Sequence, residues 1–228
     1  MTTIESILAR IAKEHMQIET LQTRNLIGDQ KMKFEELLVG MGKRVSRTLM
    51  QWAKHKSIEQ FWKECERADL MLELLGLMAG EPGWPTLEQV VLMAADCAET
   101  VQHRVPAGEE RPRKAIATAR AWAVGEATIE EVRAAAADAY AAYVSYAADD
   151  DAAADAADAA HSAASAAYSG NAADDAYCAA AAAAAVAEDD AYAADEDADA
   201  AKAKKLAELA DLIRPRFSPV SENLGLER

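Results

Sequence analysis

Apolar residues recur along this chain at every third or fourth position, in stretches separated by short polar or glycine- and proline-rich breaks. Such spacing places the apolar side chains on one helix face, so it predicts helices rather than strands. The first stretch opens with Thr2 and Glu5, a capping-box pair. Its apolar face consists of Ile4, Ile7, Leu8, Ile11, Ile18 and Leu21. A break at Gly28 precedes a second stripe, from about Lys31 to Trp52, which predicts a second helix.

Three further capping pairs mark where later helices are expected to begin. They are Ser57 with Gln60, Thr86 with Gln89, and Thr128 with Glu131. Breaks follow at 81–85, 106–108 and 125, and the last stripe ends at Ile213, before a proline. Because no stretch alternates as a strand does, the sequence predicts an all-α fold, a multi-helix bundle or array with an alanine-rich, acidic C-terminal half.

The predicted helices fall into three segments. Residues 1–56 are expected to form an N-terminal helical hairpin, an accessory element that carries its own apolar stripes and is suited to forming a homodimer. Residues 57–214 are expected to form one all-helical domain, with a single helix from Ser57 to Leu75. Residues 215–228 are expected to be a loose tail.

Charge sets the C-terminal half apart. Residues 1–124 hold 17 Lys/Arg and 17 Asp/Glu, so the whole net charge of −15 lies after them. Between Ala134 and Ala201 there are 15 acids and no Lys or Arg. Such a surface repels nucleic acid and anionic membranes and attracts basic partners. We therefore expect no direct nucleic-acid binding, no membrane association, and a protein partner with a basic groove.

The acids of this half gather at 149–158, 174–175 and 188–199. The candidate partner-binding residues are Asp149, Asp150, Asp151, Asp155, Asp158, Asp174, Asp175, Glu188, Asp189 and Asp190. The first two clusters lie where helices are predicted to begin, and acids there stabilise the helix dipole by ~0.3–1 kcal/mol each. A set of well-capped, solvated helices is therefore an alternative to a binding surface.

One spacing favours the binding interpretation. Asp151, Asp155 and Asp158 stand at positions i, i+4 and i+7, on one helix face. With a rise of ~1.5 Å per residue, successive carboxylates follow each other at roughly 5–6 Å along the axis. Phosphates along a nucleic-acid strand have spacings of the same order. This ladder predicts a DNA mimic that occupies a basic groove.

Residues that could carry chemistry form no motif. Cys65, Cys97 and Cys178 are odd in number and fit no metal spacing, so we expect free thiols in a reduced cytoplasm. The histidines form no ligand pair, and the pair Asp158–His161 on one helix face is weak support for acid–base catalysis. The N-terminus lacks a signal-peptide pattern, and the longest apolar run is too short to span a bilayer. We expect a cytoplasmic protein without cofactor, metal or enzymatic activity.

Three sequence motifs point to a known family. They are CERAD at 65–69 with an apolar run to 76, AADCAE at 94–99, and RPRKAI at 111–116 continuing through ARAW to GEA at 125–127. Followed by the Ala/Tyr/Asp array, they make residues 61–201 resemble a bacterial immunity-protein family, the fifth immunity family of polymorphic toxin systems. The resemblance implies an all-helical binding protein that neutralises an effector, often a toxin nuclease, without a cofactor.

Two features depart from that family pattern: residues 1–56 lie outside it, and the array is poor in basic residues. They suggest a repurposed member, such as a phage-borne inhibitor of a bacterial defence complex. The leading hypothesis is thus a proteinaceous inhibitor that occludes the basic groove of a toxin nuclease, a CRISPR complex or a restriction complex. The alternative is a structural or assembly scaffold, for example a phage-associated one, without inhibitory activity.

Overall fold

A computed structural model of the chain describes residues 33–41, 44–219 and 224. The chain divides into two compact units, 1–32 and 33–228. The first predicted helix, with its capping pair, lies outside the described residues, and so does most of 220–228. The fold described here is that of the second unit.

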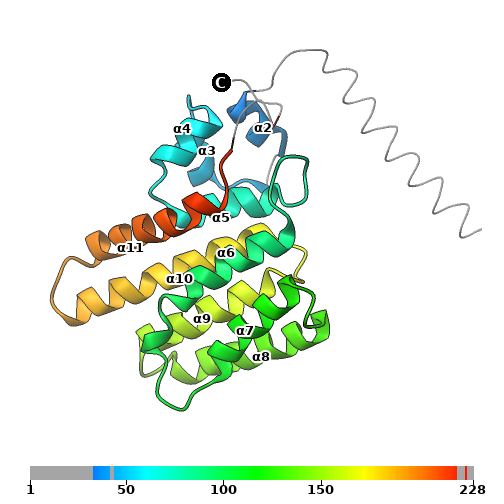
Figure 1. Ribbon diagram of the computed structural model, residues 1–228. Coiled ribbons are helices and arrows are strands. Elements are labelled where there is room, and N and C mark those ends of the chain that lie inside the picture. The colour runs from blue at the N-terminus through cyan, green and yellow to red at the C-terminus, as the bar shows by residue number, and fades with distance from the viewer. Residues whose placement is uncertain (1–32, 42–43, 220–223, 225–228) are drawn as a thin grey trace, which may run out of the picture. The chain divides into compact units, whose positions relative to one another are not determined.

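This unit is built from helices, and the described residues contain no strand, as predicted. The first helices are α2 (Phe34–Met41), α3 (Arg47–Ala53), α4 (Ile58–Glu64), α5 (Ala68–Leu77) and α6 (Leu87–Glu99) (Figure 1). After the 3-10 turn η2 (Gln102–Arg104) come α7 (Arg111–Ala123), α8 (Ile129–Tyr146), α9 (Asp151–Ser165), α10 (Ala172–Ala193), α11 (Ala198–Ile213) and the 3-10 turn η3 (Arg214–Arg216). None of these helices is long and apolar enough to cross a membrane.

Three of the predicted capping boxes are present. At Ser57, Thr86 and Thr128 the hydroxyl accepts the backbone N–H three residues on, while the side chain at that third position accepts the backbone N–H of the cap. Each box satisfies two donors that the first turn of a helix leaves unpaired. Helices α4, α6 and α8 therefore begin where the sequence predicts.

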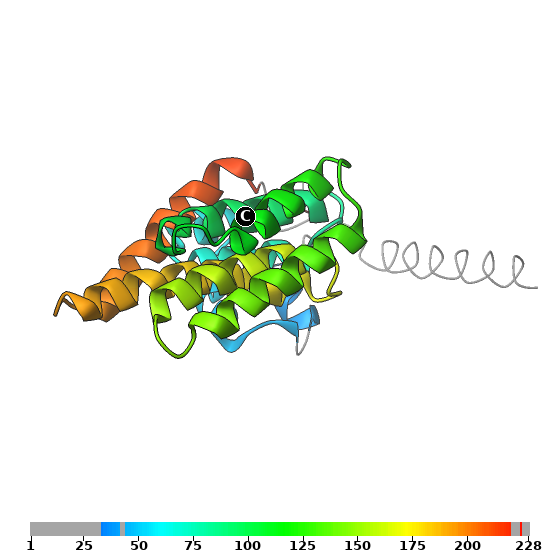
Figure 2. The ribbon, with the colours of Figure 1, turned by 90° about the horizontal axis from the view of Figure 1, so that it is seen from below.

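Helix α9 is the centre of the alanine-rich half. It packs against α8 and α10, which run beside it, and against α6 and α7 on its other faces (Figures 1 and 2). Eleven of its 15 residues are buried. Alanine suits this place because it lets neighbouring helices approach closely and loses no side-chain entropy on burial. The alanine-rich sequence thus produces a helix surrounded by others.

Helix α10, 22 residues long, joins the alanine-rich half to the earlier helices. It packs against α5, α6, α9 and α11. Its start lies so close to α5 that a Cβ atom added to Gly76 would stand 2.4 Å from the Cα atom of Ala173. Glycine is therefore required at this crossing.

Residues 33–41 and 44–56 pack onto the main body, and the chain divides after residue 32 rather than at the expected boundary, residue 56. The rings of Phe34 and Phe61 lie with their centroids 5.4 Å apart. The carboxylate of Glu73 on α5 accepts the backbone N–H of Ser46 at 2.6 Å and its hydroxyl at 2.7 Å. These contacts tie α2 and α3 to α4 and α5.

Two helices predicted as continuous are interrupted. The stripe from Lys31 to Trp52 is divided into α2 and α3, because Ser46 is extended and its hydroxyl accepts the N–H of Leu49 as an N-cap. The stripe from Ser57 to Leu75 is divided into α4 and α5 by a turn at 65–67.

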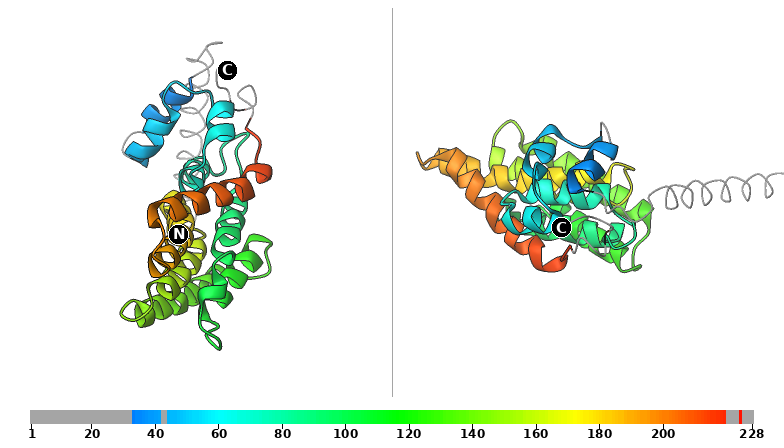
Figure 3. Two further views of the ribbon diagram at one scale, coloured as in Figure 1. Left: turned by 90° about the vertical axis from the view of Figure 1, so that its left-hand side faces the viewer. Right: turned by 90° about the horizontal axis from the view of Figure 1, so that it is seen from above.

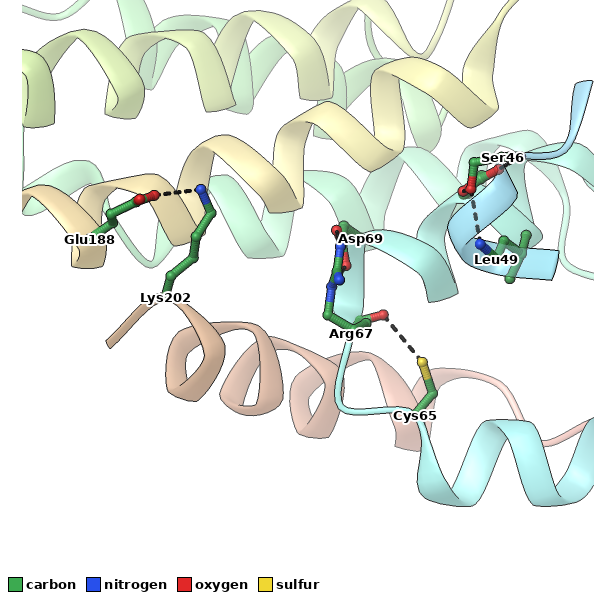
Figure 4. A network of polar contacts seen from close by, with 8 residues as sticks. Ser46, Leu49, Cys65, Arg67, Asp69, Glu188 and Lys202 are labelled. Carbon is green, nitrogen blue, oxygen red and sulfur yellow. Dashed lines mark hydrogen bonds and ion pairs between the residues drawn. The ribbon is translucent and has the colours of Figure 1, made fainter. Parts of the chain in front are cut away.

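The turn at 65–67 places a hydrogen-bond donor beside a buried acid. Asp69 is only 2% exposed. Arg67, in the turn, donates to it through Nε at 2.9 Å and Nη2 at 2.5 Å (Figure 4). A buried carboxylate needs such a partner, and Arg67 reaches it from outside the helix. The apolar stripe alone does not reveal this requirement.

The segment after α11 is packed, in contrast to the loose tail expected from residue 215. The ring of Phe217 lies 5.3 Å from that of Trp62 and 5.6 Å from that of Trp84, between centroids. Arg214 donates to the carbonyl oxygens of Trp62 at 3.1 Å and Cys65 at 2.9 Å. In Figure 3 this red segment lies beside the cyan α4. Aromatic packing and carbonyl acceptors therefore order residues 214–217.

Candidate functional site

The hairpin of α9 and α10 brings together acids that are about 40 positions apart in the sequence. Because the two helices run antiparallel, the start of α9 lies beside the end of α10 (Figure 1). We call this group the acidic end. It consists of Asp149, Asp150, Asp151, Asp155, Glu188, Asp189 and Asp190. Seven of the ten predicted contact residues thus share one place.

The turn that leads into α9 positions the first of these acids. Asp150 has an extended backbone and its carboxylate accepts the N–H of Ala153 at 3.0 Å, so it is the N-cap of α9. Asp149 and Asp151, on either side, are exposed. Asp151 stands in the first helical turn, where a negative charge is stabilised by the dipole. The capping role expected of this cluster therefore belongs to Asp150.

Two basic residues compensate part of the acidic end. Lys202 of α11 forms an ion pair with Glu188 (Figure 4). Arg104 of η2 forms one with Asp190, at 3.0 Å. Among the described residues no Lys or Arg pairs with Asp149 or Asp151. From the sequence, Lys202 is expected to compensate Asp195, Asp197 and Asp199, whereas it pairs with Glu188, and the role of Arg104 was not predicted.

Asp155 and Asp189 face each other across the contact of α9 and α10. Both are half-buried. Burial, together with the nearby charge of Asp189, raises the pKa of Asp155 to about 7. Burial also raises the pKa of Asp189, whose side chain is in hydrogen-bonding reach of Asp155. These two acids therefore contribute less than two full charges at neutral pH.

The remaining predicted residues lie elsewhere. Asp158, one turn beyond Asp155, is half-buried, and burial raises its pKa while the charge of His161 opposes the rise. Asp174 and Asp175 stand at the start of α10, the opposite end of the hairpin from the acidic end. Of the expected ladder, Asp151 is therefore exposed to solvent, whereas Asp155 and Asp158 are half-buried between helices.

Sequence reasoning missed another acid near this end. Glu109, in the loop before α7, accepts a hydrogen bond from the hydroxyl of Tyr146 at 3.3 Å. Tyr146 in turn lies close to Asp150. The guanidinium of Arg111 lowers the pKa of Glu109 to about 2, so this acid stays ionised. No periodic signal reveals it, because the contact joins a loop residue to the last residue of α8.

Two features outside the acidic end are relevant to chemistry. A cavity of about 570 Å³ opens between the segment before α3, α5 and the start of α10, with the carboxylate of Glu73 and the ring of Tyr177 in its wall. Burial raises the pKa of Cys65 and Cys178 to about 11 and of Cys97 to about 12, so these thiols are protonated at neutral pH. In the described parts of the chain, no cluster of three His, Cys, Asp or Glu is arranged to hold a metal ion.

The acidic end is thus a surface with an excess of carboxylates, and three of them, Asp149, Asp150 and Asp151, are exposed and have no basic partner among the described residues. Comparison with protein-family models, with curated proteins and with solved structures finds no match to this chain. The resemblance to an immunity family therefore stays a prediction from the motifs.

Proposed function

We propose that this chain is a helical inhibitor protein that binds a basic surface of a nucleic-acid-processing effector, such as a toxin nuclease, through its acidic end. The observation that supports the proposal best is the convergence of two acid clusters, 149–155 and 188–190, at one end of the α9–α10 hairpin. Within the described part of the chain, two cations, Arg104 and Lys202, pair with it.

The charges available to a partner are those at the surface. Asp149 and Asp151 are exposed, and Asp190 keeps 42% of its side chain exposed beside Arg104. A basic groove on a partner can compete with Arg104 for Asp190 and approach the two aspartates directly. Complementary charges of this kind raise association rates and select among partners.

The test measures cleavage of a fluorescent DNA by purified nucleases, one at a time, with and without this chain. We expect inhibition of a nuclease with a basic substrate groove, with an affinity that falls between 0.1 and 1 M salt, because the screening length shrinks from ~10 to ~3 Å. In the variant Asp149→Asn/Asp151→Asn, inhibition should weaken about two- to thirtyfold, since exposed pairs contribute ~0.2–1 kcal/mol each.

A matched control removes two exposed charges far from the acidic end. Glu81→Gln/Asp174→Asn has the same net charge as the test variant and likewise loses one acid from a loop and one from a first helical turn. We expect it to inhibit like the unchanged chain. Equal weakening by both variants contradicts a role for the acidic end. Inhibition of none of the nucleases would favour the scaffold alternative.

A further inference from the structure

One carboxylate oxygen of the acidic end is buried without a hydrogen-bond partner among the described residues. Oδ2 of Asp189 is shielded from solvent and accepts no hydrogen bond from any described donor. Buried polar atoms in folded proteins nearly always have a partner. The side chain of Asp155, on the facing helix, is within hydrogen-bonding reach of Asp189. The side chain within reach that could satisfy Asp189 is therefore another carboxyl group.

A carboxyl group donates a hydrogen bond only while it carries a proton. When Asp155 is protonated, its hydroxyl can donate to Asp189, and both groups are satisfied. When both are ionised, two negative charges face each other in a half-buried contact where water screens them poorly. A single proton therefore stabilises the contact between Asp155 and Asp189. The doubly ionised pair lacks this hydrogen bond, and a distant cation cannot replace it.

The charges around Asp155 and Asp189 do not neutralise the repulsion between the two carboxylates. On α9 Asp151 and Asp158 add negative charge near Asp155, and on α10 Glu188 and Asp190 add it near Asp189. From α11 Lys202 acts on Asp155, but it is paired with Glu188. From η2 Arg104 is paired with Asp190.

We propose that Asp155 and Asp189 share a single proton at neutral pH, and that this proton fastens the start of α9 to the end of α10 until rising pH removes it. The proposal rests on the contact between the two helices and holds whether or not the acidic end binds a partner. It makes the acidic end sensitive to proton concentration near neutrality, at a contact to which no histidine of the described residues contributes.

The sign of the effect follows from the pKa of Asp155, raised to about 7 from an ordinary value of ~3.9 in an unfolded chain. Between those values the folded chain holds a proton that the unfolded chain has released. Stability therefore falls as the pH rises from about 4 to about 7, and it levels off above that window. A group that holds one extra proton changes the unfolding constant about tenfold per pH unit inside the window.

The experiment compares urea unfolding of the full chain from pH 5 to pH 8 with that of Asp155→Asn. The asparagine amide donates to Asp189 without titrating, so it imitates the protonated carboxyl group. Relative to the unchanged chain, we expect this variant to unfold with a constant that is already about tenfold smaller at pH 5 and at least a hundredfold smaller at pH 8. Equal pH dependence in both proteins overturns the proposal.

The control is Asp199→Asn, an exposed acid in the first turn of α11, which should keep the pH dependence of the unchanged chain. Other acids with raised pKa, such as Asp158 and Glu73, contribute equally to all three proteins. A direct reading comes from carbon NMR of the Asp155 carboxyl group in the unchanged chain. Titration near pH 7 supports the proposal, whereas titration near pH 4 refutes it even if the variant fails to fold.

Discussion

At the scale of single residues, Ser46 and Ser57 both cap a helix, but only Ser46 also contacts a residue that is distant in the sequence. Each serine is an N-cap whose hydroxyl accepts a backbone N–H three residues on. Ser57 makes its bonds in an exposed capping box, whereas Ser46 also donates its hydroxyl to the buried carboxylate of Glu73. The capping role can be predicted from neighbouring residues in the sequence. The bond from Ser46 to Glu73 cannot, because the two residues are 27 positions apart.

Replacing each serine by alanine separates the two roles. Ser57→Ala should cost about 1 kcal/mol of unfolding free energy, the usual loss for an N-cap. Ser46→Ala should cost about 1–2 kcal/mol more, because it also removes a donor from the 5%-exposed Glu73. Urea unfolding at pH 7 measures both. Equal losses would mean that Glu73 replaces the lost donor, for example with water.

Burial raises the pKa of Glu73, while its bonds from Ser46 oppose that rise. In Ser46→Ala the carboxyl group should therefore bind its proton more tightly, and the extra cost should shrink as the pH falls towards 5.

At the scale of helices, the close crossing of α5 and α10 depends on one glycine. Gly76→Ala places a methyl group 2.4 Å from the Cα atom and 2.7 Å from the backbone nitrogen of Ala173, which cannot move as a flexible side chain can. We expect a loss of about 1–3 kcal/mol, typical of overpacking. The matched control is Gly40→Ala in α2, where nothing lies within 4 Å and the helix should gain up to ~1 kcal/mol.

Thermal or urea unfolding of the two variants tests the crossing, since intrinsic helix propensity alone predicts a gain for both. If Gly76→Ala is as stable as Gly40→Ala, then the helices separate at little cost and the crossing is looser than described.

The sequence predicted the helices better than their contacts. Starts at Ser57, Thr86 and Thr128 are local chemistry and were predicted correctly. The interruption between α2 and α3 and the turn at 65–67 were missed, because a hydrogen bond to a buried acid, Glu73 or Asp69, accompanies each of them and the apolar spacing does not show such bonds. Acids within the array were recognised as candidates. Which of them meet was not predictable, because that depends on the antiparallel pairing of α9 with α10.

At the scale of the whole unit, the C-terminal segment connects the last helix to the earliest ones. Phe217 packs on Trp62 and Trp84, and Arg214 binds carbonyl oxygens of α4 and of the turn that follows it. Replacing Phe217 by alanine should cost about 1–3 kcal/mol, below the ~3–5 kcal/mol of a fully buried phenylalanine because Phe217 is half-exposed.

Tryptophan fluorescence and urea unfolding report this change. We expect a red-shifted emission in Phe217→Ala, since water reaches both indole rings, and a smaller effect in Phe217→Leu, which keeps an apolar cover. Unchanged emission and stability in the alanine variant would show that the segment contributes nothing to the core.

The same contacts constrain how the chain acquires its structure as it is made. Phe34 packs on Phe61 and Phe217 on the adjacent Trp62, so the first and last described elements meet on one short helix. During synthesis α4 leaves the ribosome long before residue 217 does. The faces of Trp62 and Trp84 that Phe217 covers therefore stay in water until residue 217 has been synthesised and has left the ribosome. A nascent chain stalled before that residue presents an aromatic surface, the kind of surface that favours aggregation and chaperone binding.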